Sequence, residues 1–169
     1  FADGGGGRSV ETERSSSSGL YCLAFWDYAK LKGSCPLVGI VSGRCFAGNT
    51  VLLGCSDVII ATENANIGMG GPAMIEGGGL GVFKPEDVGP VSDHVPNGVI
   101  DILVKDEEQA VSAAQKYLGY FQGDLSEWEC PDQHLLRTVI PENRLRVYDV
   151  RNVIDLLADT DSVLELRKG

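Results

Sequence analysis

One stretch of the chain, residues 38–79, constrains the fold and the function more than any other. It begins with an apolar, β-branched run over residues 37–41, which is typical of a buried strand. The run breaks at Ser42, and a short apolar helix is expected over residues 46–53. A second buried run, residues 58–61, follows at once. The stretch therefore predicts a strand, a tight turn, a helix and a second strand.

The turn in this stretch carries small residues, Gly43, Ala47 and Gly48, which let a ligand approach the backbone closely. A helix that begins at such a turn leaves its first backbone N–H groups without partners. Those N–H groups favour an anion, or an oxyanion that develops during a reaction. We therefore predict that the turn stabilises an oxyanion.

The rest of the chain adds helices and strands around this stretch. Apolar side chains at helical spacing predict a helix over residues 19–32. Glycine and proline punctuate residues 71–98, where short helical turns are expected at 72–76 and 85–88. Residues 99–104 predict another buried strand. Strands that alternate with helices indicate the α/β class.

Two further helices are expected in the second half. Asp106 is expected to cap the first, with Gln109 at the third helical position, and this helix stops at Gly123. Residues 124–143 are expected to be irregular, and Asp149 is expected to cap the last helix. The predicted inward faces of the two helices are Ala110, Ala114, Tyr117, Leu118 and Phe121, and Val150, Val153, Ile154 and Leu157. Residues 162–166 are expected to form a final strand.

Composition excludes several classes of protein. The length of 169 residues favours one domain with a sizeable core, and 43% apolar with 22% charged residues is ordinary for a globular chain. The net charge of −10 argues against a nucleic-acid partner, which usually needs a basic footprint. No run approaches about 18 apolar residues, so no membrane span is expected. The N-terminus shows no secretory signal.

The cysteines argue against a metal site. They form no C-x-x-C pair, and neither histidine stands at ligand spacing to them. An odd number of thiols without metal spacing predicts reduced, mostly buried cysteines in a cytoplasmic protein. The five cysteines are Cys22, Cys35, Cys45, Cys55 and Cys130.

Several motifs have two interpretations. Residues 68–73 fit G-x-G-x-x-A, but Pro72 inside the motif argues against a dinucleotide site. His94 and His134 have no triad partner in the sequence, and a structural role is favoured for each. Arg8 and Arg44 lie in glycine-rich turns, where either a salt bridge or a phosphate contact is expected. Capping and solvation account for the carboxylates near the central stretch: Asp57, Glu63, Glu76, Glu86 and Asp87.

With these residues in hand, the chain resembles the carboxyltransferase subunits of propionyl-CoA and acetyl-CoA carboxylases, members of the crotonase superfamily. The resemblance runs from Asp3 to about Leu166. Residues 3–8 (DGGGGR) stand for an Asp-Ser-Gly-Gly-Ala-Arg-like turn, and residues 43–48 (GRCFAG) for a Gly-Pro-Cys-Ala-Gly-Gly turn. Short motifs with matching gaps follow in order, namely Gly71-Pro72, residues 89–94, Asn97-Gly98-Val99 and Tyr148-Asp149-Val150.

The resemblance implies a fold and a set of site residues. The fold would be the α/β spiral of ββα units of the ClpP/crotonase type, here the latter part of the first of two such domains. The backbone N–H groups of Gly7 and Gly48 would hold the thioester oxygen of an acyl-CoA as it becomes an enolate, with Gly6 and Ala47 shaping the same turns. The residues expected to contact acyl-CoA elsewhere are Arg8, Arg44, Gly43 and Gly71.

The resemblance also implies cofactors and partners. Biotin, carried as carboxybiotin on a biotin carboxyl carrier protein and loaded by a biotin carboxylase, would supply CO₂ and the base that removes the α-proton. No metal would be bound. The chain would be a partial N-terminal carboxyltransferase domain over residues 1–169, with the second domain absent. It would assemble with the rest of the carboxyltransferase into a homo- or hetero-oligomer, for which the resemblance implies a hexamer. No side-chain base is then required, and the fragment alone would not turn over.

Three other functions remain open from the sequence. A crotonase-type enoyl-CoA hydratase or isomerase shares the fold and the turn, but it needs a carboxylate beside the thioester, and Glu63 or Glu76 would have to serve. A ClpP-like protease needs a serine after the turn, where Asn49 and Thr50 stand. A non-catalytic assembly fragment is the third alternative. Two bulky residues in the turn, Arg44 and Phe46, also predict an altered acyl pocket.

Overall fold

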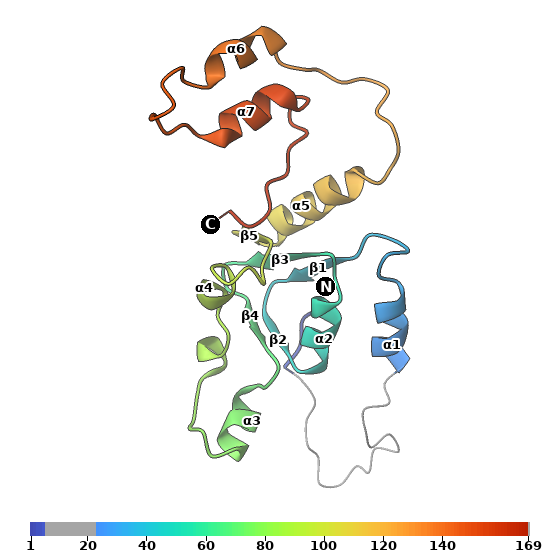
Figure 1. Ribbon diagram of the computed structural model, residues 1–169. Coiled ribbons are helices and arrows are strands. Elements are labelled where there is room, and N and C mark those ends of the chain that lie inside the picture. Colours follow the sequence, from blue (N-terminus) through green and yellow to red (C-terminus); the bar gives the residue numbers. More distant parts are fainter. Residues whose placement is uncertain (6–22, 169) are drawn as a thin grey trace. The chain divides into compact units, whose positions relative to one another are not determined.

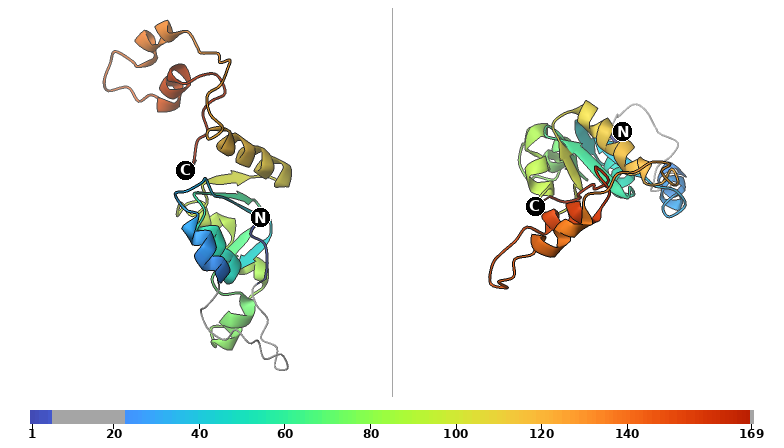
Figure 2. Two further views of the ribbon diagram at one scale, coloured as in Figure 1. Left: turned by 90° about the vertical axis from the view of Figure 1, so that its right-hand side faces the viewer. Right: turned by 90° about the horizontal axis from the view of Figure 1, so that it is seen from above.

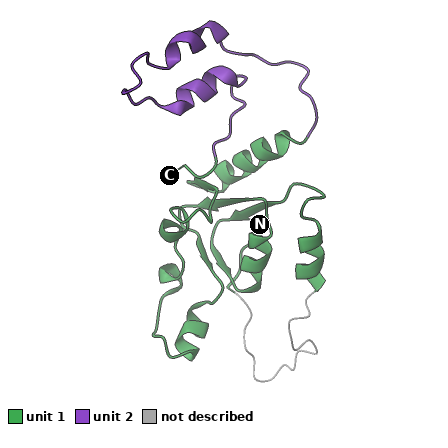
Figure 3. Ribbon diagram, viewed as in Figure 1, with its two compact units in different colours: residues 1–121, 166–169 green, residues 122–165 purple. Residues whose placement is uncertain are grey.

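The computed structural model describes residues 1–5 and 23–168, which form two compact units (Figure 1, Figure 3). Unit 1 comprises Phe1–Phe121 and Leu166–Gly169, and unit 2 comprises Gln122–Glu165. The elements of unit 1 are α1 (Leu23–Lys30), β1 (Val38–Val41), β2 (Arg44–Phe46), α2 (Gly48–Gly54), β3 (Val58–Thr62), β4 (Asn66–Gly68), α3 (Pro72–Gly77), η1 (Pro85–Asp87), α4 (Val91–His94), β5 (Ile102–Val104) and α5 (Glu107–Gly119).

A three-stranded parallel sheet in the order β1-β3-β5 forms the centre of unit 1. Val38 of β1 lies opposite Val58 of β3. Successive side chains of a strand point to opposite faces, so each strand supplies both layers of the core. Figure 2 shows α5 lying along the sheet, and the fully buried Ile60 packs there with Ala110 and Ala114 of that helix. The prediction that Ala110 and Ala114 face inward is confirmed.

The opposite face of this sheet packs on the elements that carry the turn. Val41 of β1 and Ala61 of β3 belong to one buried cluster with Cys45 of β2, Leu53 of α2 and Ile67 of β4. All five side chains are at most 4% exposed. The strand, helix and strand expected for residues 38–61 are present as β1, α2 and β3, and the short strand β2 lies between β1 and α2.

A second, smaller parallel sheet pairs β2 with β4, with Arg44 opposite Asn66. The N-terminal segment extends it, because the N–H of Gly4 donates to Arg44 O (2.6 Å) and the N–H of Phe46 donates to Gly4 O (3.0 Å). On the far side of β4, the N–H of Ile67 donates to the carbonyl of Gly89 (2.8 Å). Chain segments distant in sequence thus meet at this small sheet.

Both predicted helix caps are confirmed. Asp106 Oδ1 accepts from the N–H of Gln109 (2.9 Å) at the start of α5, and Asp149 Oδ1 accepts from the N–H of Arg151 (2.9 Å). α5 ends at Gly119 rather than at Gly123. The chain beyond α5 makes tighter i→i+3 turns, which include the bond from Phe121 N to Leu118 O (3.1 Å).

Unit 2 is a small helical unit with its own contacts. It carries η2 (Gln133–Leu135), α6 (Leu136–Val139) and α7 (Val150–Leu157), so the stretch expected to be irregular contains short helical pieces. Gln133 Nε2 donates to Leu156 O (2.6 Å), and Arg151 pairs with Glu165. The apolar face of α7 is not buried, since Val150 and Leu157 are 56% and 63% exposed. Within unit 2, α7 packs on α6 and η2, which leave most of that face uncovered.

Further sequence-based boundaries differ from the structure. The expected helix over residues 46–53 begins two residues later, because Phe46 ends β2 and Ala47 turns the chain. Of the strand expected over residues 99–104, only residues Ile102–Val104 form a strand, β5. Residues 162–166 form no strand; just after them, Arg167 donates from its backbone to Asp101 O (2.7 Å) and pairs with the Asp101 carboxylate (2.8 Å).

Candidate active site

The turn between β2 and α2 has a strained backbone. Ala47 has φ 56° and ψ −121°, a conformation that side-chain-bearing residues seldom adopt and that costs about 1–3 kcal/mol. The surroundings hold it there, because the N–H of Ala47 donates to Gly68 O (3.0 Å) and its carbonyl accepts from the N–H of Thr50 (3.0 Å). Strain of this kind concentrates at functional sites, so Ala47 marks the turn as a candidate site.

The N–H group that follows Ala47 is the central feature of the site. Among the described residues, the N–H groups of Gly48 and Asn49 donate to no acceptor. Both are at the start of α2, where N–H groups have no partner within the helix. The hydroxyl of Thr50 fixes this helix start by donating to Cys45 O (2.7 Å) and Gly68 O (3.0 Å). The turn can therefore offer N–H donors to an oxyanion, as the sequence predicts.

The second glycine-rich segment lies beside this turn. The carboxylate of Asp3 accepts from the backbone N–H groups of Ser42 and Gly43 (both 3.2 Å) and from the Ser42 hydroxyl (3.3 Å). Gly4 continues the contact by pairing with Cys45. Asp3 thus holds together the motifs of residues 3–8 and 43–48, which are 35 or more residues apart in the sequence.

The start of α3 closes the same region. Gly71 precedes Pro72, the first residue of α3. A Cβ at Gly71 would lie 3.6 Å from the ring of Phe46 and 3.7 Å from Gly5 O. Gly71, one of the predicted site residues, therefore lies next to the turn. Of the other predicted residues, Gly6, Gly7 and Arg8 lie outside the described residues.

An aromatic ring packs on Gly48 from α1. A Cβ at position 48 would lie 2.8 Å from Phe25 Cζ, so a side chain there would collide with the ring unless the ring moved. Phe25 is partly buried, whereas its neighbour Trp26 is 64% exposed and lies within 5.0 Å of the Lys30 ammonium. The close approach of Phe25 therefore disfavours a side chain at position 48, independently of the motif in which Gly48 lies.

Arg44 is engaged in an ion pair. Its guanidinium lies 2.5 Å from the carboxylate of Glu86, and both side chains are more than half exposed. The pKa of Glu86 lies below its usual value, first because its own backbone N–H donates to the carboxylate and then because of Arg44. Of the two interactions expected for Arg44, the structure shows the salt bridge. A phosphate group would have to compete with Glu86 for the Arg44 guanidinium.

Other ionisable groups near the core have structural partners. Burial raises the pKa of the Cys45 thiol, against a smaller lowering by the Thr50 hydroxyl, so Cys45 stays protonated and is a small core residue. One ring nitrogen of His94 bonds to Ile67 O (2.8 Å). Asp57 accepts from the N–H of Leu37 (2.9 Å) and from Lys32 (3.0 Å), and these partners lower its pKa.

Residues 1–5 and 23–168 contain no group of three or more His, Cys, Asp and Glu side chains arranged to hold a metal ion. In the same part of the chain, no helix combines the length and the apolar character that crossing a membrane requires.

Sequence reasoning missed two features of the site. The role of Asp3 in joining the motifs depends on strand pairing between remote segments, although an acidic residue before a glycine run is a common turn signal. The contact of Phe25 with Gly48 has no signal in the sequence, because it depends on how α1 packs on α2.

Comparison with known proteins identifies the family. The whole chain, residues 1–169, matches the family described as carboxyl transferase domain. The chain is 28% identical over 178 residues to the methylmalonyl-CoA carboxyltransferase 12S subunit of Propionibacterium freudenreichii subsp. shermanii, covering 100% of this chain and 34% of that protein. It is 27% identical to the biotin-dependent acetyl-/propionyl-coenzyme A carboxylase beta6 subunit of Mycobacterium tuberculosis, covering 79% and 29%. The chain spans about a third of the length of these relatives.

Solved structures agree with the family. A single-chain, multi-domain long-chain acyl-CoA carboxylase shares 56% identity with a TM-score of 0.92, over 99% of this chain and 16% of that chain. The transcarboxylase 12S structure, a hexamer, shares 26% identity with a TM-score of 0.70, over 86% and 30%. The chain therefore belongs to the carboxyl transferase domain family, and it has the crotonase-like α/β fold expected from its sequence.

Proposed function

We propose that this chain is the part of a biotin-dependent acyl-CoA carboxyltransferase that binds the acyl-CoA thioester and stabilises its enolate. The observation that carries the proposal is the strained turn at Ala47, which leaves the N–H of Gly48 without an acceptor among the described residues. Membership of the carboxyl transferase domain family supports the same chemistry.

The chain's own contribution is electrostatic. The N–H of Gly48, with that of Gly7, donates to the thioester oxygen, which becomes an oxyanion when the α-proton leaves. A fixed donor of this kind costs no reorganisation during the reaction, and the loss of one such donor typically costs roughly 3–4 kcal/mol in the transition state. Gly6 and Ala47 shape the two turns, and Arg8, Arg44, Gly43 and Gly71 are proposed contacts to the CoA portion.

Carboxybiotin, when bound, supplies CO₂ and a ureido anion that accepts the α-proton. No side chain of this chain then has to act as the base, and we assign none of its described residues to biotin. In this proposal the second carboxyltransferase domain completes the site. The biotin carrier and the biotin carboxylase are further components, on the same chain or on partners, and the assembly is an oligomer, with a hexamer as the first expectation.

The acyl group is proposed to be long. The structure with 56% identity is titled a long-chain acyl-CoA carboxylase, whereas the 12S relative named for methylmalonyl-CoA shares 26–28% identity. The higher similarity favours the long-chain substrate class.

The complete enzyme assembly that contains this chain should incorporate labelled bicarbonate into acyl-CoA, and avidin should block the incorporation. The control is enoyl-CoA hydration measured on the same preparation, since a crotonase-type hydratase needs no biotin. Hydration that proceeds without biotin, in an assembly that carboxylates no acyl-CoA, would refute the proposal.

A further inference from the structure

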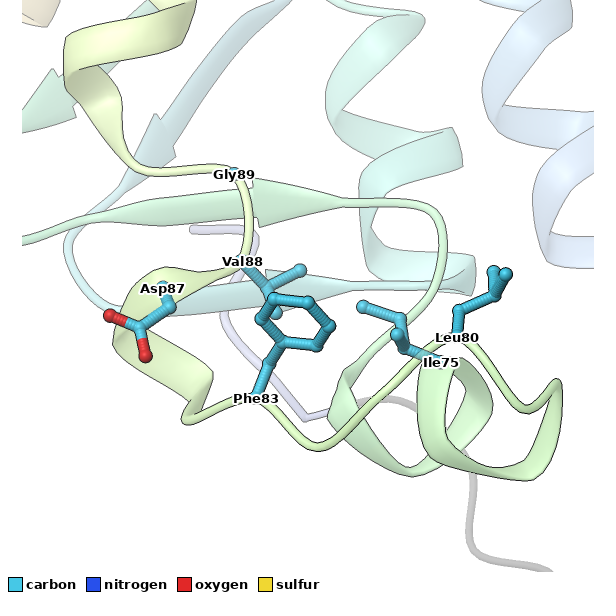
Figure 4. A pocket seen from close by; sticks show the side chains of 6 residues that line it. All are labelled: Ile75, Leu80, Phe83, Asp87, Val88 and Gly89. Atoms are coloured by element: carbon cyan, nitrogen blue, oxygen red, sulfur yellow. The ribbon is translucent and has the colours of Figure 1, made fainter.

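A hollow of about 370 Å³ lies in unit 1 beside α3 (Figure 4). Its lining is mostly apolar and consists of Ile75, Leu80, Phe83, Asp87, Val88 and Gly89. The ring of Phe83 stands between Val88 and Ile75, while the carboxylate of Asp87 points away from this apolar group. The hollow is open to solvent, and its volume and mostly apolar lining lie in the range typical of small-molecule sites.

One wall of the hollow is fixed to the small sheet. Asn66 Nδ2 donates to the carbonyls of Glu86 (2.9 Å) and Val88 (3.1 Å), and Gly89 O accepts from the N–H of Ile67 (2.8 Å). These bonds hold the backbone of Val88 and Gly89 along β4. A wall held in this way can position a ligand without first becoming ordered.

The other wall is exposed and rich in glycine. Leu80 is 75% exposed and Phe83 is 46% exposed, and residues 77–81 read GGGLG. The N–H of Leu80 donates to Ile75 O (3.1 Å), so this wall begins directly at the end of α3. This wall therefore presents two large apolar side chains, Leu80 and Phe83, on a backbone with few steric restrictions.

Two elements connect the hollow with the candidate site. α3 begins at Gly71, beside the ring of Phe46, and it supplies Ile75 to the hollow one turn later. β4 links the two regions as well, because Gly68 O holds the N–H of Ala47 and the preceding residue, Ile67, bonds to Gly89. The same two elements therefore border the oxyanion turn and the hollow.

We propose that this hollow is the subsite for the distal part of the acyl chain of the substrate, with Leu80 and Phe83 setting the preferred chain length. The inference rests on the proposed acyl-CoA function and adds the place where the apolar tail lies. An alkyl chain is the occupant that suits the lining, since the one acidic side chain points away from the apolar group and would not be desolvated.

The test compares two matched variants of the complete enzyme. Leu80→Trp places a bulky ring in the lining, and Val82→Trp places the same ring on an 80% exposed neighbour that is not part of the lining. Affinities for propionyl-CoA and palmitoyl-CoA are measured by calorimetry, which needs no turnover. Adding or removing one methylene's worth of space in an apolar pocket changes discrimination by about tenfold or more. We expect Leu80→Trp to lower the palmitoyl-to-propionyl affinity ratio by at least about tenfold and Val82→Trp to leave it unchanged.

A second variant changes the hollow in the opposite direction. Phe83→Ala enlarges it, and we expect the longest chain that binds well to increase. An unchanged affinity ratio in both Leu80→Trp and Phe83→Ala would overturn the proposal. The proposal would also be overturned if the variants lost their oligomeric state and their affinities for propionyl-CoA and palmitoyl-CoA fell equally. The hollow would then be part of an interface between subunits. Failure of carboxylation with the ratio shifted as expected would instead refute the proposed reaction and leave the subsite standing.

Discussion

The α-carbon of Gly89 lies directly against the carbonyl of Ile67. A Cβ at position 89 would lie 1.8 Å from Ile67 O, and Gly89 has φ 56°. The same two residues share a backbone hydrogen bond of 2.8 Å, and Ile67 O also bonds to the ring of His94 (2.8 Å). This contact joins β4 of the small sheet to the segment that leads into α4.

Gly89→Ala should destabilise unit 1 strongly. The left-handed conformation alone costs a side-chain-bearing residue about 1–2 kcal/mol, and the collision with a backbone carbonyl adds to that because the carbonyl cannot rotate away. The free energy of unfolding, measured by denaturant titration, should fall by roughly 2 kcal/mol or more. Gly54→Ala is the control: nothing lies within 4 Å of a Cβ there, and its helical position should make the change neutral or slightly stabilising. If the two variants were equally stable, the contact between Gly89 and Ile67 would not contribute to the stability of unit 1.

Gly48→Val should lower carboxylation while acyl-CoA still binds. The added side chain meets Phe25, so either the ring or the strained turn at Ala47 must move. A displacement of about 1 Å at a catalytic group can cost about a hundredfold in rate, and we expect a loss of that order in kcat/KM.

The Phe25 contact supplies the control for this prediction. The double variant Gly48→Ala/Phe25→Leu should recover more activity than Gly48→Ala alone, because the smaller side chain removes the collision. A well-folded Gly48→Val enzyme with near-normal carboxylation would remove Gly48 from the site.

Sequence pattern predicted the elements that depend on local signals. The buried strands β1 and β3 read as continuous apolar runs, and the caps Asp106 and Asp149 stand directly before their helices. β2 and β4 were not predicted, because strands of three residues are too short to show a period. The start of α2 was misplaced because Ala47 reads as a helix former, whereas pairing of Phe46 with Gly68 fixes it as a turn.

The candidate site was predicted only in part, for a similar reason. The small residues of the turn are visible in the sequence, and so is the glycine run after Asp3. Their meeting depends on the parallel pairing of Gly4 with Cys45, and the hollow depends on how residues 75–89 fold back on β4. Contacts between segments that are remote in the sequence leave no local sequence pattern, so they can be recognised only in the structure.

Acid should destabilise the chain partly through Asp57. Hydrogen bonds from Leu37 and Lys32 place its folded pKa below the unfolded value of about 3.9. Its contribution to stability is therefore present above about pH 3.9 and is lost as the pH falls through the lower, folded pKa. Asp57→Asn removes this titration, so its free energy of unfolding should fall less than that of the wild type between about pH 5 and pH 3. Parallel pH curves for the two proteins would show that Asp57 does not contribute.

No side chain of this chain should act as an essential general acid or base. Such groups typically contribute about 10²–10⁴-fold to the rate, and the geometry gives each candidate another role. His94 bonds to the backbone of Ile67, Asp57 holds Leu37 and Lys32, and Glu63 and Glu76 are exposed. The substitutions His94→Asn, Asp57→Asn, Glu63→Gln and Glu76→Gln should therefore each keep most of kcat in the complete enzyme.

Any losses in these variants should appear in KM or in stability, and most clearly in His94→Asn, because its ring supports the contact between Ile67 and Gly89. Carboxylation and enoyl-CoA hydration are both measured, together with the free energy of unfolding, so that a folding defect is separated from a catalytic one. Hydratase chemistry predicts the opposite result, in which one carboxylate variant loses kcat at unchanged KM and stability. A drop of about a thousandfold in kcat for one well-folded variant would assign that residue a proton-transfer role. It would then replace the ureido anion as the base in the reaction proposed for this chain.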